Sequence, residues 1–220
     1  MPIVRALDFH HTLGALGRGV GVTLGVWPLV IMVLILGPVY GAFMGSYEFE
    51  TVVRLKMLWY SAIKVPLLIF ATSLVCLPGF FVFNTVAGLR TEFSASLRAI
   101  LAGQAALAAA LAALGPLTRV IYSSGVAYQS ALLVNAGMFA AATLVGHRVM
   151  MRHYAPLIGR DARHRLMVWL WVTLYAFVGI QMGWMLRPFI GAPNVPVTFF
   201  REEKFTNAYV FVTKLIVHQF

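Results

Sequence analysis

The chain has 220 residues, of which 60% are hydrophobic and only 11% are charged, and its formal net charge is +10. Soluble domains carry about 25% charged residues, so this composition excludes an ordinary soluble domain and indicates a membrane protein. Most of the basic residues flank apolar stretches, where Lys and Arg determine topology and meet anionic headgroups. We therefore expect anionic lipids, and no nucleic acid, as partners.

Five long apolar stretches follow one another along the chain. They occupy residues 20–42, 58–82, 97–117, 128–145 and 166–186. A hydrocarbon core about 30 Å thick needs about 20 helical residues to cross it. Backbone groups in lipid must be hydrogen-bonded within their own segment, so each stretch is predicted to be a transmembrane helix. The sequence thus predicts one all-α membrane domain over residues 1–220, with 187–220 as an extramembrane tail.

Both terminal segments have interfacial character. Apolar residues recur at helical spacing from Phe9 to Val20, which predicts a helix lying on the membrane surface. The same spacing runs from Phe205 to Ile216 in the tail, although the β-branched and aromatic content there also fits a strand.

Six glycines recur at steps of four in and around the first stretch. They are Gly17, Gly21, Gly25, Gly37, Gly41 and Gly45. Glycines at this spacing share a helix face and let another helix approach closely. The predicted role is helix packing, either within this chain or against partner subunits. The alanine-rich third stretch offers a similarly smooth surface.

Four polar side chains lie inside the predicted spans. Lys64 is six residues into the second stretch, where a charge is costly and therefore a functional candidate. Its long stem can reach the headgroups from that depth, so we interpret it as snorkelling unless a partner is present. Gln104, Asn135 and Gln181 are expected to hydrogen-bond neighbouring helices rather than to form a substrate site.

A basic joint follows the fourth stretch and is predicted to bind phosphate headgroups. Its arginines are Arg148, Arg152, Arg160, Arg163 and Arg165. By the positive-inside rule this joint lies in the cytoplasm, with the N-terminus cytoplasmic and the C-terminus periplasmic in a bacterial inner membrane.

Chemistry-bearing residues are sparse. The histidines lie outside the span centres, which disfavours a buried haem or chlorophyll and indicates solvated or lipid-facing side chains. They are His10, His11, His147, His153, His164 and His218. No nucleophile is paired with a base along the sequence, so we predict no catalytic residue, no metal site and no cofactor other than bound lipids.

The exit from the last stretch has its own pattern. Pro188 prevents the helix from continuing, so the chain is expected to turn there. The predicted anchors of the tail are Trp184, Arg187, Phe199, Phe200 and Tyr209.

Two parts of the chain carry a resemblance. The segments S-A-I-K-V-P-L-L and L-P-G-F-F-V-F-N, together with Q-M-G-W-M-L-R-P-F-I-G and F-F-R, resemble a group of uncharacterised bacterial inner-membrane proteins. That resemblance implies a location but no activity and no site residue. The five-span plan is also similar in topology to Yip1-type membrane proteins.

These observations favour a non-catalytic accessory or scaffold subunit of a larger bacterial membrane complex, for which a respiratory or photosynthetic assembly is one candidate. The alternative is a small-solute transporter or channel component whose path is lined by the intramembrane polar residues. A third interpretation, a lipid-modifying enzyme, would use the arginines to hold phosphates but lacks an acid–base pair.

Overall fold

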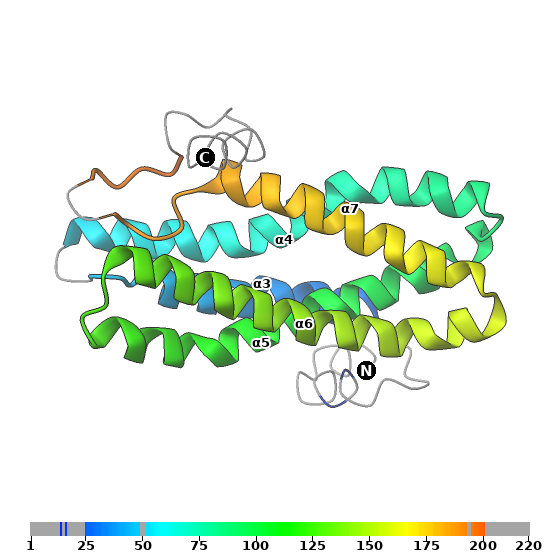
Figure 1. The fold of residues 1–220 in the computed structure, drawn as a ribbon, viewed down its shortest axis with the longest axis horizontal. Coiled ribbons are helices and arrows are strands. Elements are labelled where there is room, and N and C mark those ends of the chain that lie inside the picture. Colours follow the sequence, from blue (N-terminus) through cyan, green and yellow to red (C-terminus); the bar gives the residue numbers. More distant parts are fainter. Residues whose placement is uncertain (1–13, 15, 17–24, 49–51, 193–194, 201–220) are drawn as a thin grey trace, which may run out of the picture.

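The computed structural model describes residues 14, 16, 25–48, 52–192 and 195–200. Within these ranges the chain is helical and has no strand. The long helices are α3 (Val26–Gly45), α4 (Val52–Val86), α5 (Phe93–Ser123), α6 (Tyr128–Arg160) and α7 (Arg163–Leu186), and a short 3-10 turn, η1 (Arg90–Glu92), precedes α5 (Figure 1). All five are long and apolar enough to cross a membrane. The all-helical, multi-pass prediction is confirmed.

The helices continue beyond the apolar stretches. α6 has 33 residues, about 50 Å at 1.5 Å per residue, and ends only at Arg160. Hydropathy marks where apolar sequence stops, whereas a helix continues as long as its residues are good helix formers. Arg148 and Arg152 therefore lie within α6, and only Asp161 and Ala162 connect it to α7.

The arrangement of the helices follows from where their small residues lie. α5 packs extensively against both α3 and α6, α3 packs against α4, and α4 packs against α7 (Figure 1). The alanines of α5 are largely buried, including Ala102, Ala105 and Ala108. Short side chains let backbones approach, and this close packing drives helix association in lipid. In contrast, α6 and α7 make few contacts with each other.

Glycine positions fix two of these contacts. A Cβ at Gly41 would overlap the carbonyl oxygen of Ser61 on α4, and one at Gly45 would lie 2.8 Å from the Cα of Leu58. On the other side of the bundle, a Cβ at Gly146 of α6 would lie 2.7 Å from the carbonyl oxygen of Gly103 on α5. Only glycine permits backbones this close.

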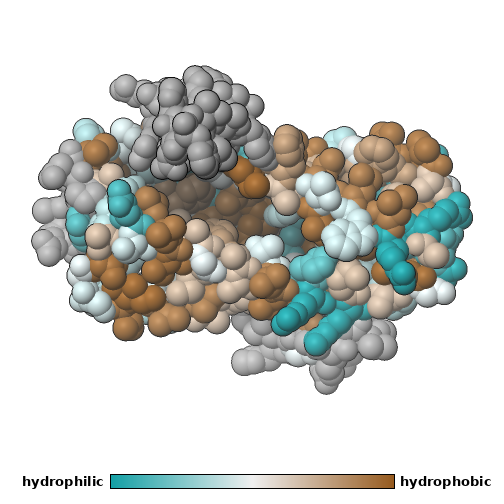
Figure 2. Space-filling model, viewed as in Figure 1, coloured by the Kyte–Doolittle hydropathy of each residue, from teal (hydrophilic) through white to brown (hydrophobic). Residues whose placement is uncertain are grey.

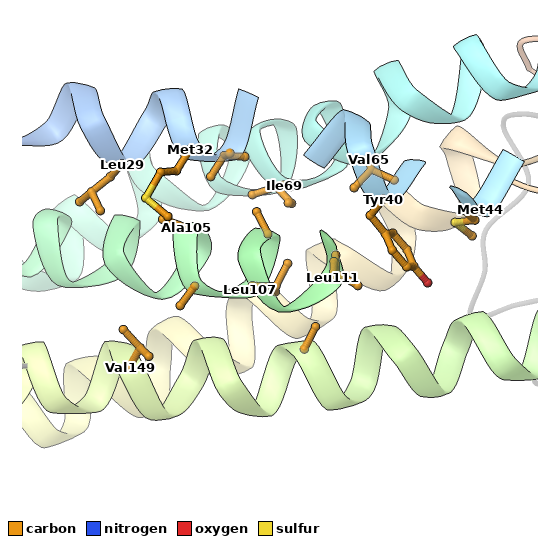
Figure 3. Packing of buried hydrophobic residues seen from close by; sticks show 14 of the residues in the cluster. Leu29, Met32, Tyr40, Met44, Val65, Ile69, Ala105, Leu107, Leu111 and Val149 are labelled. Carbon is orange, nitrogen blue, oxygen red and sulfur yellow. The ribbon is translucent and has the colours of Figure 1, made fainter. Parts of the chain in front are cut away.

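The core lies between α3, α4, α5 and α6. Leu29 and Met32 of α3, Ile69 of α4 and Leu111 of α5 belong to one cluster, and Figure 3 shows its side chains spread along the space between the helices. A second cluster joins Phe80 of α4 and Trp171 of α7 with residues of α5 and α6 such as Ile100 and Tyr154. The outward faces are also apolar, while hydrophilic residues gather toward the end where α4 connects to α5 and α6 to α7 (Figure 2).

α7 is the feature that positions the site. It starts at the end of the bundle that holds the α4–α5 connection and stops at Leu186, well short of the opposite end (Figure 1). The stop before Pro188 agrees with the sequence expectation. Residues 187–192, here called the exit segment, continue without helical structure over the part of α4 that α7 leaves uncovered.

Candidate functional site

Lys64 and Ser61 of α4 hold the exit segment by its backbone. The Lys64 ammonium donates a hydrogen bond to the carbonyl oxygen of Pro188 at 2.6 Å. The Ser61 hydroxyl donates to the carbonyl oxygen of Phe189 at 2.5 Å. Residues three apart lie on one face of a helix, so this spacing presents two donors to two consecutive carbonyls.

Lys64 is completely buried, with 0% of its surface exposed. Aromatic rings complete its surroundings: the Nζ atom lies 4.8 Å from the centroid of the Phe199 ring and 5.9 Å from that of Phe189. The snorkelling interpretation is therefore wrong, because the ammonium bonds to a carbonyl inside the protein instead of extending to the surface. Sequence reasoning did not consider that a backbone carbonyl oxygen and two ring faces could serve as the partner.

This arrangement satisfies the polar groups of a backbone segment that is not helical. Non-helical backbone at membrane depth is tolerated only where it is buried in protein and its polar groups are satisfied. The exit segment meets both conditions, since Ile190 is only 1% exposed and the two carbonyls before it accept bonds from α4. The chemistry of Lys64 is thus that of a hydrogen-bond donor to backbone.

The predicted tail anchors occupy the same region. The guanidinium carbon of Arg187 lies 3.4 Å from the centroid of the Trp184 ring, a stacked contact at the end of α7. Phe199 packs edge-on against Tyr60 of α4, with ring centroids 5.1 Å apart, and against Phe200 at 4.8 Å. Tyr209 lies outside the described residues. The first part of the tail is therefore anchored to this chain's own α4.

Gln104 belongs to a second polar group. Its Nε2 atom donates to the Ser73 hydroxyl at 2.5 Å, and that hydroxyl donates to the carbonyl oxygen of Ile69 at 2.7 Å. Because the only proton of Ser73 is used on Ile69, Gln104 must present its nitrogen to Ser73. The Oε1 atom of Gln104 is buried and has no hydrogen-bond partner among the described residues.

Asn135 is the centre of a third group, between α3, α5 and α6. Its Oδ1 atom accepts a bond from the Tyr40 hydroxyl at 2.9 Å, and its Nδ2 atom donates to the Tyr122 hydroxyl and to the carbonyl oxygen of Ala131. Figure 3 shows the Tyr40 hydroxyl directed toward α6. Gln181 is partly buried on α7. The sequence prediction that such amides join helices describes the bonds of Gln104 and Asn135 well.

Of the six predicted glycines, three pack against another helix, one is exposed and two lie outside the described residues. Gly37, Gly41 and Gly45 lie against α4 of the same chain. Gly25 precedes α3 and is exposed, and Gly17 and Gly21 lie outside the described residues.

All five predicted headgroup arginines are exposed, and Arg160 and Arg163 lie against carboxylates. Arg160 lies 3.5 Å from a Glu92 oxygen, and Arg163 forms a 2.6 Å ion pair with Asp161. The hydrogen bonds from Arg163 lower the pKa of the Asp161 carboxyl to about 2. The other three are exposed on α6 or α7: Arg148, Arg152 and Arg165. Binding of headgroups stays a prediction for all five.

The structure also brings together residues that sequence reasoning did not join. His164 is 0% exposed, and its Nε2 atom lies 2.5 Å from an oxygen of Glu92. The ring of Tyr154 packs edge-on against that histidine at 5.7 Å. The expectation of a solvated or lipid-facing histidine is wrong for His164, because the first turn of α7 faces η1, which carries Glu92. Only the three-dimensional pairing of those turns reveals this.

No protein-family model matches the chain, and neither a curated protein nor a solved structure shows significant similarity to it. The residues that the structure describes contain no group of three or more His, Cys, Asp or Glu side chains able to hold a metal ion. Inferences about function must therefore come from the geometry above.

Proposed function

We propose that the protein is a non-catalytic, multi-spanning accessory or scaffold subunit of a larger bacterial membrane complex. The observation that carries this proposal is the separation of its buried polar groups. Lys64 bonds to the exit segment, Gln104 to Ser73 and Asn135 to two tyrosines. Each group joins helices or backbone of this chain, whereas a transport path requires polar groups that line one continuous route.

The outer surface supports the same proposal. Large apolar side chains project from α4 and α7, such as Leu74, Val82 and Trp169. These faces can meet lipid or the helices of other subunits. We further propose an inner-membrane location with a cytoplasmic N-terminus, because Arg90, Arg163 and Arg165 lie at the end of the bundle with the α4–α5 and α6–α7 connections.

Purification from native membranes in mild detergent, followed by mass spectrometry, tests the subunit role. Partner subunits that co-elute in fixed stoichiometry would support the subunit role. The same partners should co-elute with a folded Asn135→Leu variant. The alternative, a small-solute transporter or channel component, predicts a chain that elutes alone and gives solute flux in proteoliposomes. Flux that is lost in Lys64→Met or Asn135→Leu, with the fold retained, would replace the subunit proposal.

A further inference from the structure

Two exposed tryptophans and two exposed arginines surround the bundle at one depth. Trp27 of α3 is 75% exposed and Trp169 of α7 is 65% exposed. Arg98 of α5 and Arg148 of α6 are exposed as well, and neither guanidinium bonds to another residue that the structure describes. Each of the four comes from a different helix. These four residues are here called the arginine belt.

The contact between α5 and α6 places the two arginines at nearly the same depth. The backbones of Gly103 on α5 and Gly146 on α6 are in contact. Arg98 lies five residues from Gly103, about 8 Å along the helix, toward the α4–α5 connection. Arg148 lies two residues from Gly146, about 3 Å, toward the same end of the bundle. The two Cα atoms therefore lie within about 5 Å of one depth.

The contact between α6 and α7 adds the first tryptophan. The ring of His164 on α7 packs against that of Tyr154 on α6, and the two helices run in opposite directions (Figure 1). Trp169 lies five residues after His164, and Arg148 lies six residues before Tyr154. These steps correspond to about 8 and 9 Å in the same direction, so Trp169 and Arg148 share one depth.

The second tryptophan reaches this depth on α3. The ring of Phe43 on α3 packs against Gly115 on α5, and the two helices run in the same direction (Figure 1). Trp27 lies 16 residues before Phe43, and Arg98 lies 17 residues before Gly115. The corresponding lengths are about 24 and 26 Å, so Trp27 and Arg98 also share one depth.

A second set of interfacial residues lies one hydrocarbon thickness away. The exposed Arg119 of α5 is 21 residues from Arg98, which is about 32 Å along the helix. Tyr128, the first residue of α6, is 20 residues from Arg148, which is about 30 Å. A hydrocarbon core is about 30 Å thick, and Trp, Tyr, Lys and Arg gather at its two faces. The arginine belt therefore lies at the headgroups of one leaflet.

Charge identifies the kind of lipid that fits the arginine belt. At this end of the bundle Glu92 lies against Arg160, and Asp161 forms an ion pair with Arg163. No carboxylate of the described residues is left to neutralise the belt, because the remaining one, Glu48, follows α3 at the opposite end. A phospholipid with a net negative charge supplies the missing countercharge, whereas a zwitterionic phospholipid does not.

We propose that the arginine belt is a binding site for the headgroups of anionic phospholipids, in which Arg98 and Arg148 each hold a lipid phosphate. Arg160 and Arg163 are not part of the site, although the sequence places them among the headgroup arginines. The site does not depend on the subunit role proposed above.

Native mass spectrometry of the purified full chain tests the lipid preference. The chain is reconstituted in nanodiscs with equal amounts of phosphatidylglycerol and phosphatidylcholine, and the retained lipids are counted. Arg98→Gln and Arg148→Gln should each lower the ratio of retained phosphatidylglycerol to phosphatidylcholine by about 5-fold, as expected for one basic residue at an anionic surface. Arg148→Lys keeps the charge and should keep most of the preference. Arg160→Gln is the matched control and should leave the ratio unchanged.

A depth measurement tests the position of the arginine belt. Ala141 and Ala155 are exposed on α6, seven residues on either side of Arg148, and each is replaced by a spin-labelled cysteine in a Cys76→Ala background. The label at 141 should be relaxed mainly by oxygen and the label at 155 mainly by a water-soluble nickel complex, because they lie about 10 Å on opposite sides of the belt.

Four outcomes would overturn the proposal. They are labels at 141 and 155 that report the same environment, a parent protein without preference for phosphatidylglycerol, an unchanged ratio in Arg98→Gln or Arg148→Gln, and an equal fall of the ratio in Arg160→Gln.

Discussion

Replacing Lys64 with methionine tests whether its ammonium holds the exit segment. Methionine keeps most of the length of the apolar stem but removes the bond to the Pro188 carbonyl. A hydrogen bond to a charged group contributes about 1.5–3 kcal/mol net, so the segment should open about 10- to 150-fold more often. Burial of a charge is itself costly, so the global melting temperature is a poor readout and local opening must be measured.

Ile190 provides the readout because it is buried in the exit segment only two residues after Pro188. In an Ile190→Cys protein with Cys76 replaced by alanine, the rate of N-ethylmaleimide labelling reports how often the segment opens. We expect labelling to accelerate by about 10- to 150-fold in Lys64→Met. Lys56→Met is the matched control, because Lys56 is an exposed lysine of the same helix and its loss should leave the rate unchanged.

The reasoning would be refuted by an unchanged or slower rate in Lys64→Met. That result would mean that desolvation of the ammonium outweighs its bond to the carbonyl. Equal acceleration in Lys56→Met would instead indicate a general loosening of α4.

Three further predictions concern packing, an amide group and a helix start. Gly41→Ala should destabilise the protein by about 1–3 kcal/mol, because its Cβ would meet the α4 backbone, whereas Gly137→Ala, with open space around it, should be neutral or slightly stabilising in thermal unfolding. Asn135→Leu should cost about 1–3 kcal/mol, because the buried Tyr40 hydroxyl loses its acceptor and the Tyr122 hydroxyl loses a donor while keeping its bond to the Met44 carbonyl. Tyr40→Phe should cost less in the same assay, and equal losses would contradict this account. The depressed pKa of Asp161, about 2 against an ordinary 3.8, means that its charge stabilises the start of α7 above about pH 4 and stops doing so as the pH falls through 2. The melting-temperature gap between the parent and Asp161→Asn should therefore close at low pH, and a gap that is constant down to pH 2 would argue against it.

The elements of this fold could be predicted from the sequence because lipid imposes one rule on every span. A long apolar run must be a helix in hydrocarbon, so the five helices follow from hydropathy alone. Their ends do not follow, since helix α6 continues to Arg160 through residues that are polar but helix-forming. The spacing of Gly37, Gly41 and Gly45 predicted a close helix contact, and the structure identifies α4 as the neighbouring helix.

Less of the site than of the fold could be predicted from the sequence. The sequence identified Lys64 as the exceptional residue, but its acceptor is a backbone carbonyl 124 positions away, and every residue has such a carbonyl. The contact of His164 with Glu92 could not be predicted either, because it depends on how the first turn of α7 is placed against η1. The sparse contact between α6 and α7 likewise depends on how the two helices are placed, which no local sequence pattern encodes.

The hydrogen bond between Lys64 and Pro188 cannot form until long after Lys64 itself has been synthesised. The two residues are 124 positions apart, so at about 5–20 residues per second the ribosome completes the acceptor about 6–25 s after the donor. Throughout that interval α4 holds a cation whose carbonyl acceptor has not been synthesised, and a charged side chain within a span opposes insertion by up to about 2.5–3.5 kcal/mol. The nascent helix must keep this lysine at the bilayer surface or beside the translocon until α7 has emerged. The exit segment therefore closes over Lys64 only after α7 and Pro188 have been synthesised.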